Sequence, residues 1–142
     1  MIWLNRVPDL KVVKHRVHFD VYARHLADLE ALGSTVVRAE GAGRHWTVLA
    51  DPEGGEYCAF LPAELPADRL HALVVDSAEP AAQATWWAAV FGASAGHDRR
   101  GFSSVTGIPG MPIASLDFVP VPEPKTVKNR IHWDLAVADP QA

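Results

Sequence analysis

The sequence has little of several features that mark particular protein classes. Its 142 residues include a single cysteine, Cys58, which excludes a disulfide within the chain and fits a reducing compartment. No apolar run approaches the roughly 20 residues of a membrane-spanning helix, and the first residues lack the basic start and long apolar core of a signal peptide. These absences predict a cytoplasmic protein without a membrane partner.

Basic residues are also fewer than acidic ones. Thirteen Lys and Arg residues stand against 17 Asp and Glu residues, and the formal net charge is −4. Because the basic residues are scattered and form no stripe that would neutralise phosphates, we expect no nucleic-acid partner. Apolar residues make up 49% of the chain. At this length they predict one buried core and a single domain, 1–142.

An internal repeat organises the chain, since residues 7–23 return as residues 121–137 without a gap. The two segments are identical at 8 of 17 positions, namely Val7/Val121, Pro8/Pro122, Lys11/Lys125, Val13/Val127, Lys14/Lys128, Arg16/Arg130, His18/His132 and Asp20/Asp134. Such a repeat decides the architecture before any local pattern does. It predicts that residues 121–137 are the start of a further repeat.

The stretch between the two copies has the pattern strand, helix, strand, strand, strand twice over, in residues 14–61 and 69–120. In the first unit we expect a helix at 23–32, with Leu26 and Leu29 buried, that ends at Gly33. The strands are expected at 17–21, 34–39, 45–50 and 56–60.

The second unit carries a longer helical pattern at 79–91, which Ser77 caps and Gly92 ends. Its predicted core-facing stripe is Ala82, Trp86, Ala89 and Val90, widened by Trp87 and Phe91. Strands are expected at 70–76, 102–106 and 113–119, with a weaker signal for one between 92 and 101.

Both ends of the chain are predicted to be strands, at 2–7 and 130–137. Neither strand has a complete unit of its own, and exposed strand edges are aggregation hazards. We therefore expect these segments to pair with a second copy in a two-fold homodimer, or with each other. The basic side chains Lys11, Lys14 and Arg16 are expected in a solvated turn, with the alternative that Arg16 and Arg130 hold strands in register.

Alternation in residues 17–21 places His18 and Asp20 on one strand face and the apolar side chains on the other. His132 and Asp134 repeat this spacing. In each pair the carboxylate either orients and charges the imidazole or makes a purely structural hydrogen bond.

These features resemble the vicinal oxygen chelate superfamily, which contains glyoxalase I, bleomycin-resistance proteins and extradiol dioxygenases, and especially its bacterial glyoxalase-like domain proteins. The resemblance is carried by residues 14–20, 32–33, 51–58, 86–92 and 121–134. It implies an α+β fold in which tandem βαβββ units form a curved mixed sheet, a cup with the helices outside.

The resemblance also implies a divalent metal (Zn, Ni, Fe or Mn) in the cup. The first strand of each unit supplies a ligand, and His18 and His71 match those positions. The family's carboxylate position falls on Cys58, which departs from the pattern and puts the metal in doubt. A protein without a metal is the equal alternative, in which His71 and Cys58 are core residues.

Other candidates are less well placed for the metal. Glu56 lies on the face of Cys58, about 7 Å along the strand, and is the best candidate for a catalytic acid or base. Asp117 and His132 are weaker metal candidates. Ligand-binding positions in the cup are Trp46, Asp20, Cys58 and Trp133, with helix and sheet packing as the alternative for both tryptophans.

Three functions stay open at this point. The chain is a metal-dependent lyase or dioxygenase of the glyoxalase type acting on vicinal oxygens of a small substrate, a metal-free protein that sequesters a small molecule as bleomycin-resistance proteins do, or a structural fragment of a longer repeat protein. The fold hosts all of these. A glyoxalase-like domain that binds a small molecule is the reading we favour.

Overall fold

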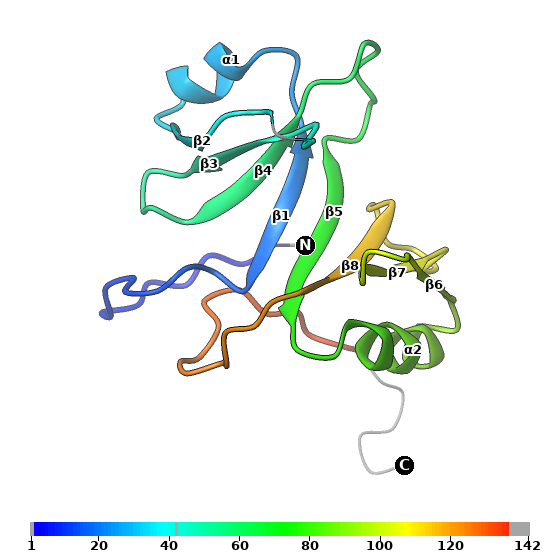
Figure 1. Ribbon diagram of the computed structural model, residues 1–142. Helices are drawn as coiled ribbons and strands as arrows, with labels where there is room; N and C mark the ends of the chain where they lie inside the picture. The colour runs from blue at the N-terminus through cyan, green and yellow to red at the C-terminus, as the bar shows by residue number, and fades with distance from the viewer. Residues whose placement is uncertain (1, 42, 137–142) are drawn as a thin grey trace.

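The computed structural model describes residues 2–41 and 43–136, which form one open eight-stranded sheet with two helices (Figure 1). The elements are β1 (Val17–Tyr22), α1 (Leu26–Ala31), β2 (Thr35–Arg38), β3 (Thr47–Ala50), β4 (Glu56–Phe60), β5 (Leu70–Ser77), α2 (Pro80–Phe91), β6 (Ser94–His97), β7 (Ser103–Thr106) and β8 (Ser115–Pro120). Neither helix is both long and apolar enough to cross a membrane in the part of the chain that is described.

The strand order β2-β3-β4-β1-β5-β8-β7-β6 shows how the two units join. The first strands of the units, β1 and β5, lie antiparallel at the middle of the sheet, and each pairs in parallel with the last strand of its own unit. The halves are therefore related by an approximate two-fold axis between β1 and β5. This confirms the predicted α+β fold, a curved mixed sheet of tandem βαβββ units.

The hydrophobic core lies between α2 and one face of the second unit. Its buried members include Val105, Leu116 and Phe118 from the sheet and Ala84 and Ala88 from the helix. Burying these side chains stabilises the fold by about 25 cal/mol for each Å² of apolar surface removed from water.

The predicted stripe of α2 was right for Trp87 and Phe91, which pack against the core, and wrong for its other four residues, because the helix is rotated from the expected setting. Trp86 and Val90 are 56% and 42% exposed, and Ala82 and Ala89 are exposed too. The buried face instead follows Ala84, Trp87, Ala88 and Phe91. Apolar residues surround this helix on all sides, so the period alone selects no face.

Helix α2 ends where the sequence predicted, but its N-terminal cap lies at a different residue. Gly92 adopts the left-handed conformation (φ 62°) after the last turn, as expected. The residue that precedes the helix is Glu79, whereas Ser77 closes β5 and its hydroxyl accepts a hydrogen bond from the Glu79 N–H at 3.1 Å. The cap was therefore predicted two residues too early.

Helix α1 is shorter than predicted, with six residues, and none of its side chains is buried. Leu26 and Leu29 are half-buried, and Leu32 is 77% exposed. Gly33 (φ 98°) ends the helix as expected, and its N–H donates to the Glu30 carbonyl at 2.9 Å. The first unit thus has a much weaker helix layer than the second.

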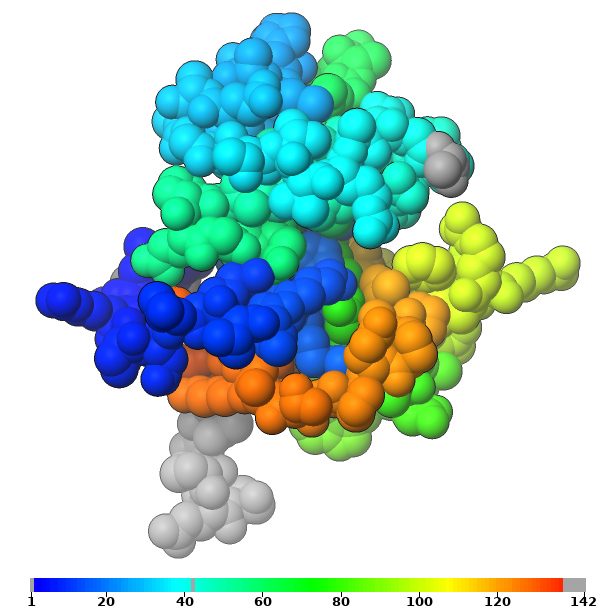
Figure 2. All heavy atoms as spheres, turned by 60° about the vertical axis from the view of Figure 1, so that its left-hand side comes forward, coloured from blue at the N-terminus to red at the C-terminus, as the bar shows by residue number. Residues whose placement is uncertain are grey.

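The predicted terminal strands are not observed. Residues 2–7 and 130–136 pair with no strand in the described chain, and Val137 lies outside the described residues. Trp3 is 74% exposed, whereas Trp133 packs against Trp87 of α2 with ring centroids 5.0 Å apart. The repeated segments 9–16 and 123–130 lie side by side, blue and orange in Figure 2, and hydrogen bonds from Arg16 and Arg130 join them.

Candidate functional site

The site lies on the face of the sheet opposite the α2 core, where β1 and β4 run in parallel. In this register Asp20 pairs with Cys58, and alternation along β1 places His18 on the same face as Asp20. The three residues are no more than 9% exposed. Sequence analysis named all three residues, and the parallel pairing of β1 with β4 brings them together.

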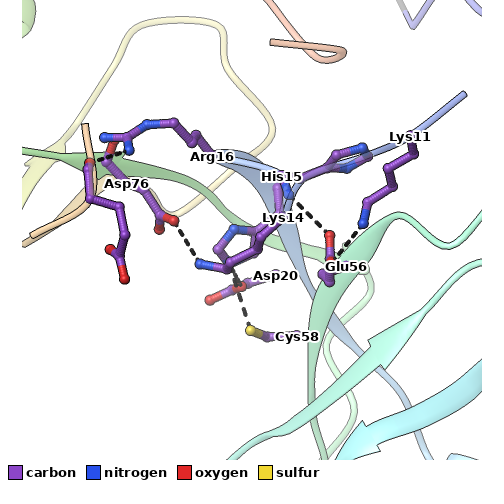
Figure 3. A network of polar contacts seen from close by, with 10 residues as sticks. Lys11, Lys14, His15, Arg16, Asp20, Glu56, Cys58 and Asp76 are labelled. Carbon is purple, nitrogen blue, oxygen red and sulfur yellow. Dashed lines mark hydrogen bonds and ion pairs between the residues drawn. The ribbon is translucent and has the colours of Figure 1, made fainter. Parts of the chain in front are cut away.

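The geometry of this triad is tight. His18 Nε2 lies 3.6 Å from Cys58 Sγ and 3.5 Å from Asp20 Oδ1. One donor atom from each residue lies within 4.8 Å of those of the other two. Figure 3 shows Asp20 and Cys58 close together at this point of the sheet.

Burial controls the charge of the triad. Burial, helped by the nearby Lys14 ammonium, lowers the pKa of His18 to about 4. Burial raises the pKa of Asp20 to about 7, where the Cys58 hydrogen bond opposes the rise and the Asp117 charge adds to it. Burial and the Asp20 charge raise the pKa of the Cys58 thiol well above its ordinary value. At neutral pH the imidazole is therefore neutral and the thiol protonated.

The site contains buried polar atoms without a hydrogen-bond partner in the described structure. They are His18 Nδ1, Asp20 Oδ1 and, on β8, Asp117 Oδ1. Such atoms are costly to bury unpaired, so they point to a missing partner, an ion or a bound molecule. Asp117 is aligned with His18 across the sheet, because both residues pair with Val74 of β5.

Two ion pairs flank the triad at the start of β1. Lys11 Nζ lies 2.7 Å from Glu56 Oε1, and Lys14 Nζ lies 2.6 Å from Asp76 Oδ2 (Figure 3). The segment before β1 thus reaches β4 on one side and β5 on the other. Sequence analysis placed both lysines in a solvated turn, which was wrong for Lys11, whose side chain is only 18% exposed.

Glu56 is a fixed anion in this structure. Burial alone would raise its pKa, but the Lys11 ammonium and the backbone N–H of His15, 3.0 Å from Oε2, hold it below the ordinary value. A carboxylate that stays charged and paired is poorly suited to move a proton near neutral pH.

His71 lies among aromatic side chains and outside the triad. Its Nδ1 lies 2.8 Å from the Tyr22 hydroxyl, and its ring lies 5.0 Å from that of Phe60. Trp46 extends this aromatic cluster, 5.8 Å from Phe60. Tyr22 and Phe60 pair in the same register as Asp20 and Cys58, so they continue the triad face. Sequence analysis missed Tyr22 and Phe60, although their alternation with Asp20 and Cys58 was the available signal.

The repeated pair His132 and Asp134 has nearly the geometry of the first pair, with Nε2 and Oδ1 3.6 Å apart. Both side chains are well exposed, 62% and 85%. No third donor joins them among the described residues. Trp133 contacts the core around α2, so packing, the alternative left open for this residue, describes its contacts.

Comparisons with known proteins agree with this architecture. The family model for the glyoxalase-like domain matches residues 1–60 and 72–142. No curated protein matches the chain.

Among solved structures, glyoxalase I from Zea mays is similar to 71% of this chain with a TM-score of 0.53 and 13% identity. Two single-residue variants of that enzyme match 72% of the chain, each with a TM-score of 0.54 and 11% identity. The chain spans only 41–42% of the length of these proteins. At this identity the likeness establishes the fold alone. The family match, which covers most of the chain, shows that this protein belongs to the glyoxalase-like domain family.

Proposed function

We propose that this domain binds a small molecule in the cup of its sheet and holds a divalent metal there through His18, Asp20 and Cys58. The observation that carries the proposal is the convergence of three different donor atoms within 4.8 Å at a buried position in the middle of the sheet.

The donor set fits a metal on chemical grounds. His18 is already neutral at pH 7 because burial lowers its pKa, so it needs no deprotonation to act as a ligand. The Cys58 thiol would have to give up its proton on binding the metal, and a thiolate beside an imidazole and a carboxylate favours Zn or Fe over Mn. The unpartnered Asp20 Oδ1 supplies a further reason for a cation at this point. A bound metal would polarise adjacent oxygens of a small substrate.

Asp117 replaces Glu56 in this proposal as the carboxylate that accepts a proton from the bound molecule. Its buried Oδ1 has no partner in the described structure, and it stands across Val74 from His18. Glu56 is occupied by Lys11.

The test is the metal content of untagged protein, purified without chelator and measured by mass spectrometry. We expect close to one equivalent in the parent, and loss of the metal in His18→Ala and Cys58→Ala. The matched control is His132→Ala, since His132 makes the same pair with an Asp but has no thiol beside it. Metal that survives in His18→Ala, or disappears in His132→Ala, would contradict the assigned site.

The second candidate is a metal-free protein that sequesters a ligand, as bleomycin-resistance proteins do. The observation that favours it is the half-buried aromatic cluster of Tyr22, Trp46, Phe60 and His71 beside the triad. Metal-free parent protein whose ligand binding is lost in Trp46→Ala and kept in Cys58→Ala would select this function.

We further propose a homodimer formed through the edge strands β2 and β6. Every residue of both strands is exposed, and unpaired edges are surfaces for association. Sedimentation of the parent as a monomer at all concentrations would exclude it.

A further inference from the structure

A cavity of about 610 Å³ lies on the face of the first unit opposite the triad. Val21 and Tyr57 line it, and these residues alternate with Asp20 and Cys58 along β1 and β4. Leu29 of α1 contributes to the apolar wall. The sheet therefore lies between the cavity and the triad, and Tyr22 at the end of β1 borders both the cavity and the aromatic cluster.

The cavity exists because the two helices pack differently. In the second unit, α2 has 12 residues and buries Ala84 and Ala88. In the first unit, α1 has six residues and buries no side chain. The surface that a longer helix would cover stays open as a cavity within the range of about 300–1,000 Å³ typical of small-molecule sites.

The cavity wall carries two arginines that are available to an anionic group and two aspartates. Arg24 and Arg69 both line it, and neither makes an ion pair within the described residues. Asp51 also lines the cavity, but its Oδ1 accepts the N–H groups of Glu53 and Gly55 at 2.9 and 2.7 Å. Asp28 is the other acid, so the four formal charges at the cavity balance. The Asp51 carboxylate is turned toward the N–H groups of its own turn, whereas the two guanidinium groups have no carboxylate partner in the described part of the chain.

The wall also offers hydroxyl groups. Ser34 Oγ lies 2.7 Å from the Tyr57 hydroxyl, and both residues line the cavity. An apolar wall with a few polar groups and two arginines suits a ligand with an apolar body and one anionic group, because guanidinium–carboxylate bonds are charge-assisted.

We propose that this cavity is a second ligand site, which takes an amphipathic organic anion, with an apolar body against Val21, Leu29 and Tyr57 and a carboxylate at Arg24 and Arg69. The site is independent of the triad and of any metal bound there.

The test uses 2-naphthoate as the probe and its neutral analogue 2-naphthamide, measured by isothermal titration calorimetry on the full chain. We expect 2-naphthoate to bind at a 1:1 ratio and 2-naphthamide to bind about tenfold more weakly, since it lacks the charge-assisted bonds. The double variant Arg24→Gln/Arg69→Gln should lower the affinity for 2-naphthoate to that for 2-naphthamide and leave the latter unchanged.

Arg99→Gln, an exposed arginine of the other unit, is the matched control and should bind 2-naphthoate as the parent does. His18→Ala and Cys58→Ala should also keep the binding, which separates this site from the proposed cup. The inference is overturned by the absence of saturable binding, by equal affinity for the acid and the amide, or by binding that His18→Ala removes and the arginine variants do not.

Discussion

Arg16 and Arg130 make the same hydrogen bond in opposite directions across the molecule. The guanidinium of Arg16 donates to the Glu123 carbonyl at 2.8 Å, and that of Arg130 donates to the Asp9 carbonyl at 2.8 Å. Residues 9 and 123 are related by the same repeat that relates the two arginines. The two segments therefore meet as copies in a two-fold dimer do, although they belong to one chain.

These arginines should differ in their effect on stability. Arg16 is half-buried and also donates to the Asp76 carbonyl at 2.9 Å, so we expect Arg16→Ala to lower the free energy of unfolding by about 1.5–3 kcal/mol. Arg130 makes one such bond and a 3.5 Å contact with exposed Glu53, which predicts about 0.5–1 kcal/mol. Urea unfolding measures both, with Arg99→Ala as the control. Equal losses for the two variants would contradict this ranking.

Gly55 has no room for a side chain. A Cβ there would lie 2.7 Å from Asp51 Oδ2 and 3.0 Å from His15 Cε1. We expect Gly55→Ala to lower the free energy of unfolding by about 1–3 kcal/mol, because the β3–β4 turn must shift.

Gly96 is the matched control, since a Cβ there meets no atom within 4 Å. Gly96→Ala should be neutral or slightly stabilising. Thermal unfolding of the two variants beside the parent gives the comparison, and a Gly55→Ala protein that melts like the parent would show that the turn adapts without cost.

The two partners of the Lys14–Asp76 ion pair differ in burial, so the loss of Lys14 should destabilise the fold. The Asp76 side chain is 6% exposed and that of Lys14 is 58% exposed. Lys14→Met leaves a buried carboxylate without its cation, and we expect a loss of about 1–2 kcal/mol, discounted for the exposure of Lys14. Lys128, the repeat equivalent of Lys14, is exposed, so Lys128→Met should change little.

Removing the Lys14 ammonium should also change the pKa of His18 in the triad. The Lys14 ammonium helps burial to lower the pKa of His18, so that pKa should rise in Lys14→Met. An NMR titration of the His18 ring checks this effect. A His18 pKa that is the same in Lys14→Met and in the parent would separate the lysine from the triad.

Stability should depend on pH through Asp20. Its pKa rises from 3.8 to about 7 on folding, so the folded state binds the proton more tightly than the unfolded state does. The resulting stabilisation is complete below pH 3.8 and is lost as the pH rises through about 7. His18, lowered from 6.5 to about 4, acts oppositely: its contribution is complete above pH 6.5 and lost as pH falls through about 4. The two dependences offset each other in the parent.

Asp20→Asn should reveal how much the Asp20 carboxyl contributes to the pH dependence of stability. Between pH 5 and pH 8 the parent should lose on the order of 2–3 kcal/mol more of its free energy of unfolding than Asp20→Asn does. Urea unfolding of metal-free protein at the two pH values makes the measurement. Parallel pH profiles for the two proteins would mean that Asp20 is ionised in the folded state.

Local signals in the sequence predicted the two helices, the strands of the sheet and part of the candidate site, but they wrongly predicted strands at 2–7 and 130–137. Alternation in β1 places His18 and Asp20 on one face, and Gly33 and Gly92 end the helices. Each of these features depends on residues within a few positions of one another, which is where backbone conformation and side-chain period act. The helix face of α2 could not be predicted in this way, because alanine and aromatic residues surround the helix.

Tertiary structure decided the rest of the site. Cys58 meets Asp20 only because β1 and β4 pair in parallel in one register, and Lys14 reaches Asp76 across 62 positions of sequence. The clearest case is the repeat itself. Residues 17–22 and 131–136 have closely similar sequences, yet the first are a central strand and the second have no strand partner among the described residues. The physical reason is that a strand is completed by hydrogen bonds from its neighbours, and β4 and β5 offer those bonds to β1 alone.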